Sequence, residues 1–191
     1  MRKLGLASLA FYYCDFREDQ KKDLRGLLSS FLVQLCHQSD CYSDVLSKLY
    51  MEHSNGSGQP SDDGLVKCLK ESLKLPGQAP VYLIIDALDE CPITSSLPSP
   101  REKVLMLVEE LMHPQIPNLR ICVTSRPETH IKGVLDPLAF RSFSLHDQIG
   151  QMEDIGNYIR SIVNTDQIMR RWNATDKQLV IEVLTNKADG M

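Results

Sequence analysis

The stretch Val81–Asp86 constrains the fold of this chain more than any other part of the sequence. Five apolar or aromatic residues, Val-Tyr-Leu-Ile-Ile, follow one another without interruption between Pro80 and Asp86. A continuous apolar run predicts a strand covered on both faces, as in a parallel sheet, whereas a half-exposed strand alternates between apolar and polar residues. We therefore expect a parallel strand inside an α/β domain.

Three carboxylates follow this run within five positions: Asp86, Asp89 and Glu90. In open α/β sheets, ligands bind beyond the carboxyl ends of the strands, where these acids would emerge. Carboxylates placed there need water, a hydrogen bond or a cation, and magnesium held beside a nucleotide phosphate is a usual occupant. A polar turn in which Asp89 or Glu90 caps the next segment would account for the same residues.

Apolar patterns elsewhere predict strands and helices in alternation. Strands are expected at residues 6–16, 81–86, 119–124 and 141–145, and helices at residues 24–35, 40–51 and 101–112. A further helix, capped by Asp62 or Asp63, is expected to carry Leu65, Val66, Leu69 and Leu73. Such alternation is typical of an α/β layered domain with a mostly parallel sheet. The remaining residues predict helical segments broken near Asn164 and Asn173. We expect an α/β core over residues 1–146 and the beginning of a helical domain over residues 147–191.

The composition of the chain limits the kinds of partner and the cellular compartment that can be expected. The net charge is -4 and there is no basic block, so nucleic acid is not expected as a partner. No apolar run has the length of a membrane span. Six cysteines without a C-x-x-C pair fit a reducing compartment, and we expect a cytoplasmic protein. The basic and apolar start of the chain also resembles a signal peptide, which would imply secretion, but no cleavage site closes it and we interpret it as a strand.

A second group of polar residues lies at the end of the strand 119–124 and just beyond it. It consists of Thr124, Ser125 and Arg126. If this strand lies beside Val81–Asp86, acids and an arginine face one crevice. Carboxylates suit a metal or a water, and a guanidinium suits phosphate oxygens. An Asp–Arg salt bridge that ties the two loops together would explain the same pair of residue types.

Two motifs in this order resemble a known family. The sequence LIIDALDEC, followed about thirty-five residues later by RICVTSRPE, resembles the Walker B and sensor regions of NACHT-type P-loop NTPases of the STAND class, and the fungal NACHT and nephrocystin-like branch most of all. LAFYYCDFREDQKKDLRGLLSSFLVQL resembles the second strand and helix of that family, and IGNYIRSIV and LTNKADGM resemble its stretches after the sheet. The resemblance implies a three-layer P-loop NTPase-like domain.

The resemblance also implies roles for residues. Asp86 would hold magnesium through its coordinated waters, and Asp89 and Glu90 would orient or deprotonate the attacking water. The nucleotide-binding set would be Thr124, Ser125 and Arg126, with Arg126 sensing the terminal phosphate. Family members use Mg²⁺ with ATP or GTP, act as nucleotide-controlled signalling switches that oligomerise, and carry effector domains and repeat arrays. We expect self-association or pairing with full-length homologues.

One departure from the family is large. A phosphate-binding loop needs the pattern G-x-x-x-x-G-K-[ST] between a strand and a helix, and none of the ten glycines here is followed by lysine. We interpret the chain as a piece of a larger protein that lacks the first strand and this loop, from a truncated gene model, a degraded paralogue or a short isoform. It is therefore expected to bind nucleotide weakly and to be inactive on its own, so that enzyme status stays open. A non-catalytic regulatory module that pairs with full-length relatives is the alternative.

Overall fold

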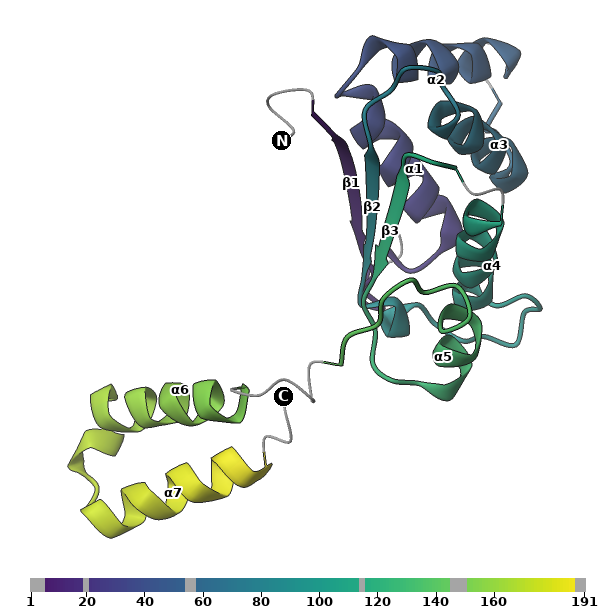
Figure 1. The fold of residues 1–191 in the computed structure, drawn as a ribbon. Coiled ribbons are helices and arrows are strands. Elements are labelled where there is room, and N and C mark those ends of the chain that lie inside the picture. The colour runs from purple at the N-terminus through teal and green to yellow at the C-terminus, as the bar shows by residue number, and fades with distance from the viewer. Residues whose placement is uncertain (1–5, 19–20, 54–57, 114–115, 145–150, 188–191) are drawn as a thin grey trace. The chain divides into compact units, whose positions relative to one another are not determined.

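The computed structural model describes residues 6–18, 21–53, 58–113, 116–144 and 151–187 (Figure 1). The chain divides into two compact units, Met1–Ala139 and Phe140–Met191. The first unit contains the sheet and all of the predicted site residues. In the described residues no helix is long and apolar enough to cross a membrane.

The sheet of the first unit consists of three parallel strands. They are β1 (Ser8–Tyr13), β2 (Val81–Asp86) and β3 (Leu119–Val123), in the order β1-β2-β3. Ser8 pairs with Val81, and Val81 pairs with Leu119. The prediction of an α/β fold with a parallel sheet is thereby confirmed, and the apolar run Val81–Ile85 lies in the central strand of the three.

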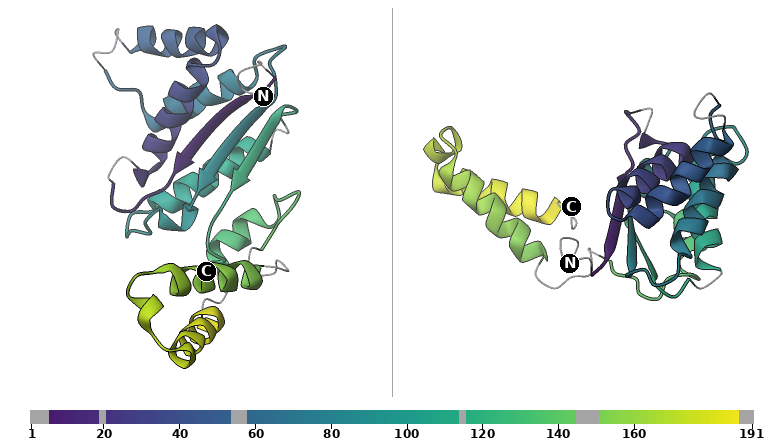
Figure 2. Two further views of the ribbon diagram at one scale, coloured as in Figure 1. Left: turned by 90° about the vertical axis from the view of Figure 1, so that its left-hand side faces the viewer. Right: turned by 90° about the horizontal axis from the view of Figure 1, so that it is seen from above.

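Helices cover the sheet on the side of its most buried residues. These helices are α1 (Leu24–Cys36), α3 (Asp62–Leu73) and α4 (Pro100–Met112), which lie behind or beside the strands in the left panel of Figure 2. Leucines at helical spacing in α1, such as Leu27, Leu28 and Leu35, are fully buried, because one apolar face of the helix meets the sheet. Leu83 and Ile85 of β2 are buried with them.

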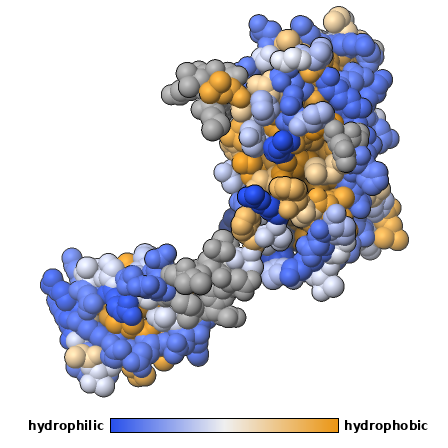
Figure 3. All heavy atoms as spheres, in the orientation of Figure 1, coloured by the Kyte–Doolittle hydropathy of each residue, from blue (hydrophilic) through white to orange (hydrophobic). Residues whose placement is uncertain are grey.

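The other face of the sheet is less covered than the continuous run predicted. Along β2, buried Val81, Leu83 and Ile85 alternate with Tyr82, which is 42% exposed, and with half-buried Ile84. Figure 3 shows hydrophobic residues gathered over the strands of this unit. The uninterrupted apolar run thus reflects one packed face and one partly exposed apolar face, and periodicity alone cannot separate that case from a strand buried on both faces.

The outer edge of β1 is occupied by two glutamine side chains, Gln34 of α1 and Gln38 of the turn that follows it. Gln38 accepts from the Leu9 N–H at 2.9 Å and donates to the Leu9 carbonyl at 2.8 Å. Gln34 does the same for Phe11, at 3.1 and 2.7 Å. The Gln38 amide also donates to the Gln34 carbonyl at 2.6 Å, so both side chains lie along β1, where they replace the hydrogen bonds of a neighbouring strand. The edge of β1 is therefore satisfied, and β3 forms the other edge of the sheet.

Three further elements complete the first unit. They are α2 (Asp40–Glu52), η4 (Leu88–Glu90) and α5 (Thr129–Leu135). The prediction that Asp62 or Asp63 caps α3 is wrong by one or two positions: Ser61 is the N-cap, and its hydroxyl accepts from the Gly64 N–H at 3.1 Å. The two aspartates lie in the first turn, where their negative charge is favourable.

The second unit is a helical hairpin of α6 (Gln151–Thr165) and α7 (Ala174–Lys187), joined through η5 (Met169–Arg171). The predicted breaks near Asn164 and Asn173 are confirmed. The predicted strand at 141–145 is wrong: residues 141–144 have no regular structure and Phe143 is 76% exposed, while Leu145 lies outside the described residues. Alternation alone does not make a strand without a partner strand beside it.

Candidate functional site at the carboxyl edge of the sheet

All three strands deliver their carboxyl ends to one edge of the sheet. Tyr13 at the end of β1 pairs with Asp86 at the end of β2, and Ile85 pairs with Val123 at the end of β3. The loops that follow these strands carry the acids and the arginine singled out from the sequence. Parallel pairing therefore brings the two predicted groups, Asp86–Glu90 and Thr124–Arg126, to the same place.

Asp86 and Thr124 are in direct contact. The Thr124 hydroxyl donates to Asp86 Oδ1 and accepts from the Ala87 N–H at 3.0 Å. The Leu88 N–H donates to the Thr124 carbonyl at 2.9 Å, so the two loops also share a backbone hydrogen bond. Ala87 has a φ of 56°, a left-handed conformation that costs about 1–2 kcal/mol for a residue with a Cβ. This strained turn directs the chain from β2 into η4.

Asp89 and Arg126 form a second contact between the same loops. The Arg126 backbone N–H donates to Asp89 Oδ1 at 3.0 Å, and Arg126 Nε lies 3.3 Å from Asp89 Oδ2. The Asp89 side chain is 9% exposed and that of Arg126 is 80% exposed. The salt bridge that the sequence left open as an alternative is thus present, and it leaves most of the guanidinium accessible to solvent.

Glu90 and Ser125 differ from these pairs. The Glu90 side chain is half-buried and forms no hydrogen bond or ion pair with the part of the chain that the structure describes. The Ser125 hydroxyl donates to the Arg126 carbonyl at 3.0 Å and is exposed. All six predicted site residues therefore lie at or just beyond the ends of β2 and β3, but side-chain contacts across the two segments join only Asp86 to Thr124 and Asp89 to Arg126.

Arg101 was missed by sequence reasoning and holds the acidic loop in place. It is 5% exposed, and it donates to the Cys91 carbonyl at 2.9 Å, to the Asp89 carbonyl and to the Glu128 carboxylate. Arg101 lies in the first turn of α4, where a positive charge opposes the helix dipole. That unfavourable position is the signal in the sequence that could have marked it.

The loop after β1 adds a further charged pair to this edge. Asp15 accepts from the Arg17 backbone N–H and from its guanidinium, at 2.8–2.9 Å. These hydrogen bonds lower the pKa of Asp15 to about 2. The same bonds raise the pKa of Arg17, to which the charge of Glu90 adds a smaller contribution. Arg17 is therefore engaged mainly by Asp15, in the loop that follows β1.

Two buried thiols lie beneath these loops. Cys14 follows β1 and Cys91 follows η4, and their sulfur atoms are 3.3 Å apart. The pKa of Cys14 is raised, because the hydrogen bond to Cys91, burial and the nearby charges of Asp86 and Glu90 all disfavour its thiolate.

The donor atoms at this edge suit magnesium only in part. The carboxylate of Asp86 and the hydroxyl of Thr124 are oxygen ligands, the kind that magnesium prefers. Among the described residues, no three His, Cys, Asp or Glu side chains gather into a group that could hold a metal ion. The residues present therefore fit a magnesium ion whose remaining ligands are water and phosphate oxygens.

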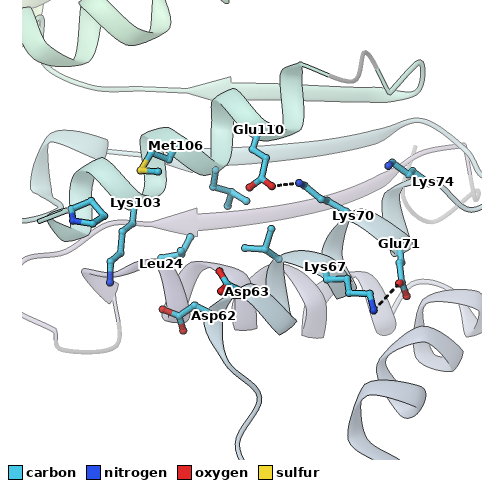
Figure 4. Close-up of a pocket in the computed structure, with 13 residues that line it drawn as sticks. Leu24, Asp62, Asp63, Lys67, Lys70, Glu71, Lys74, Lys103, Met106 and Glu110 are labelled. Carbon is cyan, nitrogen blue, oxygen red and sulfur yellow. Dashed lines mark hydrogen bonds and ion pairs between the residues drawn. The ribbon is translucent and has the colours of Figure 1, made fainter. Parts of the chain in front are cut away.

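A cavity of about 730 Å³ lies elsewhere, between α3 and α4 (Figure 4). Its lysines are matched by acids, with ion pairs Lys70–Glu110 and Lys67–Glu71. None of the six predicted site residues lines it. The balance of charge gives this groove no preference for an anion or a cation.

Comparison with known proteins agrees with part of the sequence prediction. A family model described as "Nephrocystin 3, N-terminal" matches residues 2–126, which include β1, β2, β3 and both loops of the site. Neither the curated proteins nor the solved structures contain a significant match. The chain belongs to the nephrocystin 3 N-terminal family.

Proposed function

We propose that the Met1–Ala139 unit is part of the nucleotide-binding core of a NACHT-type P-loop NTPase of the STAND class, and that its parent protein is a cytoplasmic signalling switch. One observation carries this proposal: Asp86 contacts Thr124 and Asp89 contacts Arg126 at the carboxyl edge of a parallel sheet. Ligands of open α/β folds bind at this edge. An acid beside a hydroxyl, with an accessible arginine close by, is a donor set for a metal-bound polyphosphate.

Asp86 is assigned to the metal and Thr124 to the same centre. Bound magnesium would neutralise charge on the phosphate oxygens and orient them. The Thr124 hydroxyl fixes the orientation of the Asp86 carboxylate. The backbone hydrogen bonds between the two loops hold this pair in register without help from a ligand.

Arg126 is assigned to the phosphate, with Ser125 beside it. Its side chain is 80% exposed while its Nε contacts Asp89. The remaining guanidinium nitrogens can donate to phosphate oxygens while the contact with Asp89 persists. Asp89 then acts as the residue that aims Arg126, because both of its oxygens are already engaged.

Glu90 is the better of the two candidates for the residue that orients or deprotonates water. Its carboxylate has no hydrogen bond or ion pair within the described residues, unlike that of Asp89. A general base needs a free oxygen within reach of the water it activates. The structure therefore favours separate roles for the two adjacent acids.

Nucleotide binding by this 191-residue chain should be weak, and hydrolysis slight or absent. No glycine of the sequence is followed by lysine, so the chain offers no Gly-Lys loop of backbone amides and ammonium to the phosphates. Binding then rests on the exposed guanidinium and the Asp86 centre, and we expect dissociation constants in the millimolar range with ATP or GTP.

A titration followed by amide NMR signals tests this proposal. Magnesium with ATP or GTP should shift the signals of the loops 86–90 and 124–126. Arg126→Ala and Asp86→Asn should weaken the response several-fold. Arg120→Ala removes an exposed arginine of β3 away from this edge and should leave the response unchanged. Shifts elsewhere with none in these loops, or tight binding that survives both substitutions, would contradict the proposal.

The two edges of the sheet differ, and this difference favours a second candidate function. In that function the chain is a non-catalytic module that pairs with a second copy or with full-length relatives. Gln34 and Gln38 occupy the edge of β1, whereas β3 is an edge strand in the described part. A cavity of about 340 Å³ lies along β2 and β3. Exposed edges favour strand pairing. Concentration-dependent association that slows hydrogen exchange in β3 would support this function, and a monomer at high concentration with no association with a full-length relative would exclude it.

A further inference from the structure

Cys14 and Cys91 face each other in the core of the first unit. They are 4% and 0% exposed, and their sulfur atoms are 3.3 Å apart. They come from distant parts of the sequence, since Cys14 follows the first strand and Cys91 follows the acidic loop. Each thiol is the only hydrogen-bond partner of the other in the described part of the chain.

The backbone on either side of this pair is anchored to the site. The Cys14 N–H donates to the Asp86 carbonyl at 3.0 Å, and the Cys91 carbonyl accepts from Arg101 at 2.9 Å. Both sulfur atoms are therefore held by elements that are themselves fixed. A covalent bond between them would connect the end of β1 to the far side of the Asp86–Glu90 loop.

The other four cysteines provide internal comparisons. Cys68 is as buried as Cys14, at 3% exposure, but bonds no other thiol. Cys41 and Cys122 are exposed, and Cys36 contacts the Tyr42 carbonyl rather than a sulfur. Reactivity governed by exposure would select Cys41 and Cys122, whereas the 3.3 Å distance between the sulfur atoms selects the buried pair.

We propose that Cys14 and Cys91 are an oxidative modification site, at which a peroxide converts the two thiols to a disulfide. The Cys91 thiol, whose pKa is lowered by its hydrogen bond with Cys14 and by the charge of Arg101, loses its proton, and the thiolate attacks a peroxide oxygen to give a sulfenic acid. The proton and the departing hydroxide form one water. The second thiol then attacks that sulfur and expels a second water, so that two thiols lose two electrons and two protons in total. A dithiol reductant reverses the step. Oxidation of Cys14 and Cys91 does not require that the chain binds nucleotide.

Formation of this bond should stabilise the first unit. A disulfide between positions so far apart in the sequence restricts the unfolded chain strongly. For a chain of this size we expect the thermal midpoint to rise by about 5 °C or more on oxidation. The disulfide also restrains the loop that carries Asp86, Asp89 and Glu90, which makes the redox state of this pair a means of changing the site.

Peptide mass mapping of the full chain tests the proposal. The reduced, folded chain is treated with hydrogen peroxide, the remaining thiols are alkylated in denaturant, and cross-linked peptides are identified. We expect a Cys14–Cys91 cross-link, two hydrogens lighter than the reduced peptides, as the dominant product, reversed by dithiothreitol. The same treatment of the chain unfolded in urea should give mixed pairs, because proximity is lost.

Variants separate this result from general oxidation. Cys14→Ala should abolish the cross-link and the rise in thermal midpoint, while Cys68→Ala, an equally buried control, should preserve both. The peptide map of the wild-type chain tests the proposal without any variant, so the test still holds if Cys14→Ala is destabilised. Peroxide that modifies Cys41 and Cys122 while Cys14 and Cys91 stay reduced would overturn the proposal, as would a dominant cross-link between any other pair.

Discussion

Replacing Arg101 by alanine should destabilise the first unit far more than replacing the exposed Arg126. Arg101 is almost fully buried and serves three acceptors, the carbonyls of Asp89 and Cys91 and the carboxylate of Glu128. Its loss leaves two carbonyls of the acidic loop without their charged donor. Each such hydrogen bond contributes about 1.5 kcal/mol or more.

The Glu128 contact adds less than its ionic character suggests. The Glu128 side chain is 41% exposed, so solvent screens the pair and its share is below about 1 kcal/mol. The whole substitution should therefore cost about 3–4 kcal/mol, a large part of the 5–15 kcal/mol typical of a folded domain. Arg101→Lys should recover only part of this, because an ammonium cannot reproduce the planar fork of donors.

Urea unfolding, followed through the NMR amide signals of Leu83 and Ile85 in β2, measures this cost in the first unit directly. With a denaturant slope of about 2 kcal/mol per molar, Arg101→Ala should lower the midpoint by about 1.5–2 M. Arg126→Ala is the matched control and should lower it by less than about 0.5 M, since its ion pair is mostly exposed. Equal midpoints for the two variants would refute the role given to Arg101.

Three further predictions follow from single contacts. Gln38→Ala should lower the free energy of unfolding by about 1–2 kcal/mol and increase light scattering on heating, because it uncovers part of the β1 edge. The control His37→Ala, which changes an exposed side chain next to Gln38, should have neither effect. Equal light scattering from the two variants would contradict this prediction. The pKa of Asp15 is held at about 2 instead of its usual 3.8, and it should rise toward 3.8 in Arg17→Ala when the carboxyl signal is titrated by NMR. Because the pKa is depressed in the folded state, the contribution of Asp15 to stability is present above about pH 4 and is lost as the pH falls toward 2. A pKa that the substitution leaves unchanged would refute the pairing of Asp15 with Arg17. Asp23→Ala removes the side-chain cap of α1 and should cost about 1 kcal/mol in thermal unfolding, whereas no measurable loss would show the cap to be unimportant.

The strands and long helices could be predicted because their signals are local. A continuous apolar run marked β2, a short run rich in apolar residues marked β3, and leucines at helical spacing marked α1. The failures occurred where local signals compete. Ser61, Asp62 and Asp63 are all good N-cap residues, so the helix start was ambiguous by two positions. The helix α5 is only about two turns long and buries only Ile131, which leaves too little pattern to detect.

The site could be predicted only at the level of its loops. Parallel strands deliver polar residues to one edge, and this topological rule was sufficient to place the segments 86–90 and 124–126 at the same edge of the sheet. The contacts that hold the loops are not local in sequence: Arg101 reaches back to the Asp89 and Cys91 carbonyls, and Cys14 meets Cys91 across two strands. Single-sequence periodicity carries no information on such pairs, and they required coordinates.

The most direct test of the central claim locates a metal-bound polyphosphate on the surface of the first unit. Manganese, which replaces magnesium and broadens nearby NMR signals, is added in trace amounts with ATP to the labelled chain. We expect the strongest broadening at the amides of Asp86–Leu88 and Thr124–Arg126, and its loss in Asp86→Asn. Broadening centred on the groove between α3 and α4, or none in these two loops at saturating ATP, would contradict a phosphate site at the carboxyl edge of the sheet.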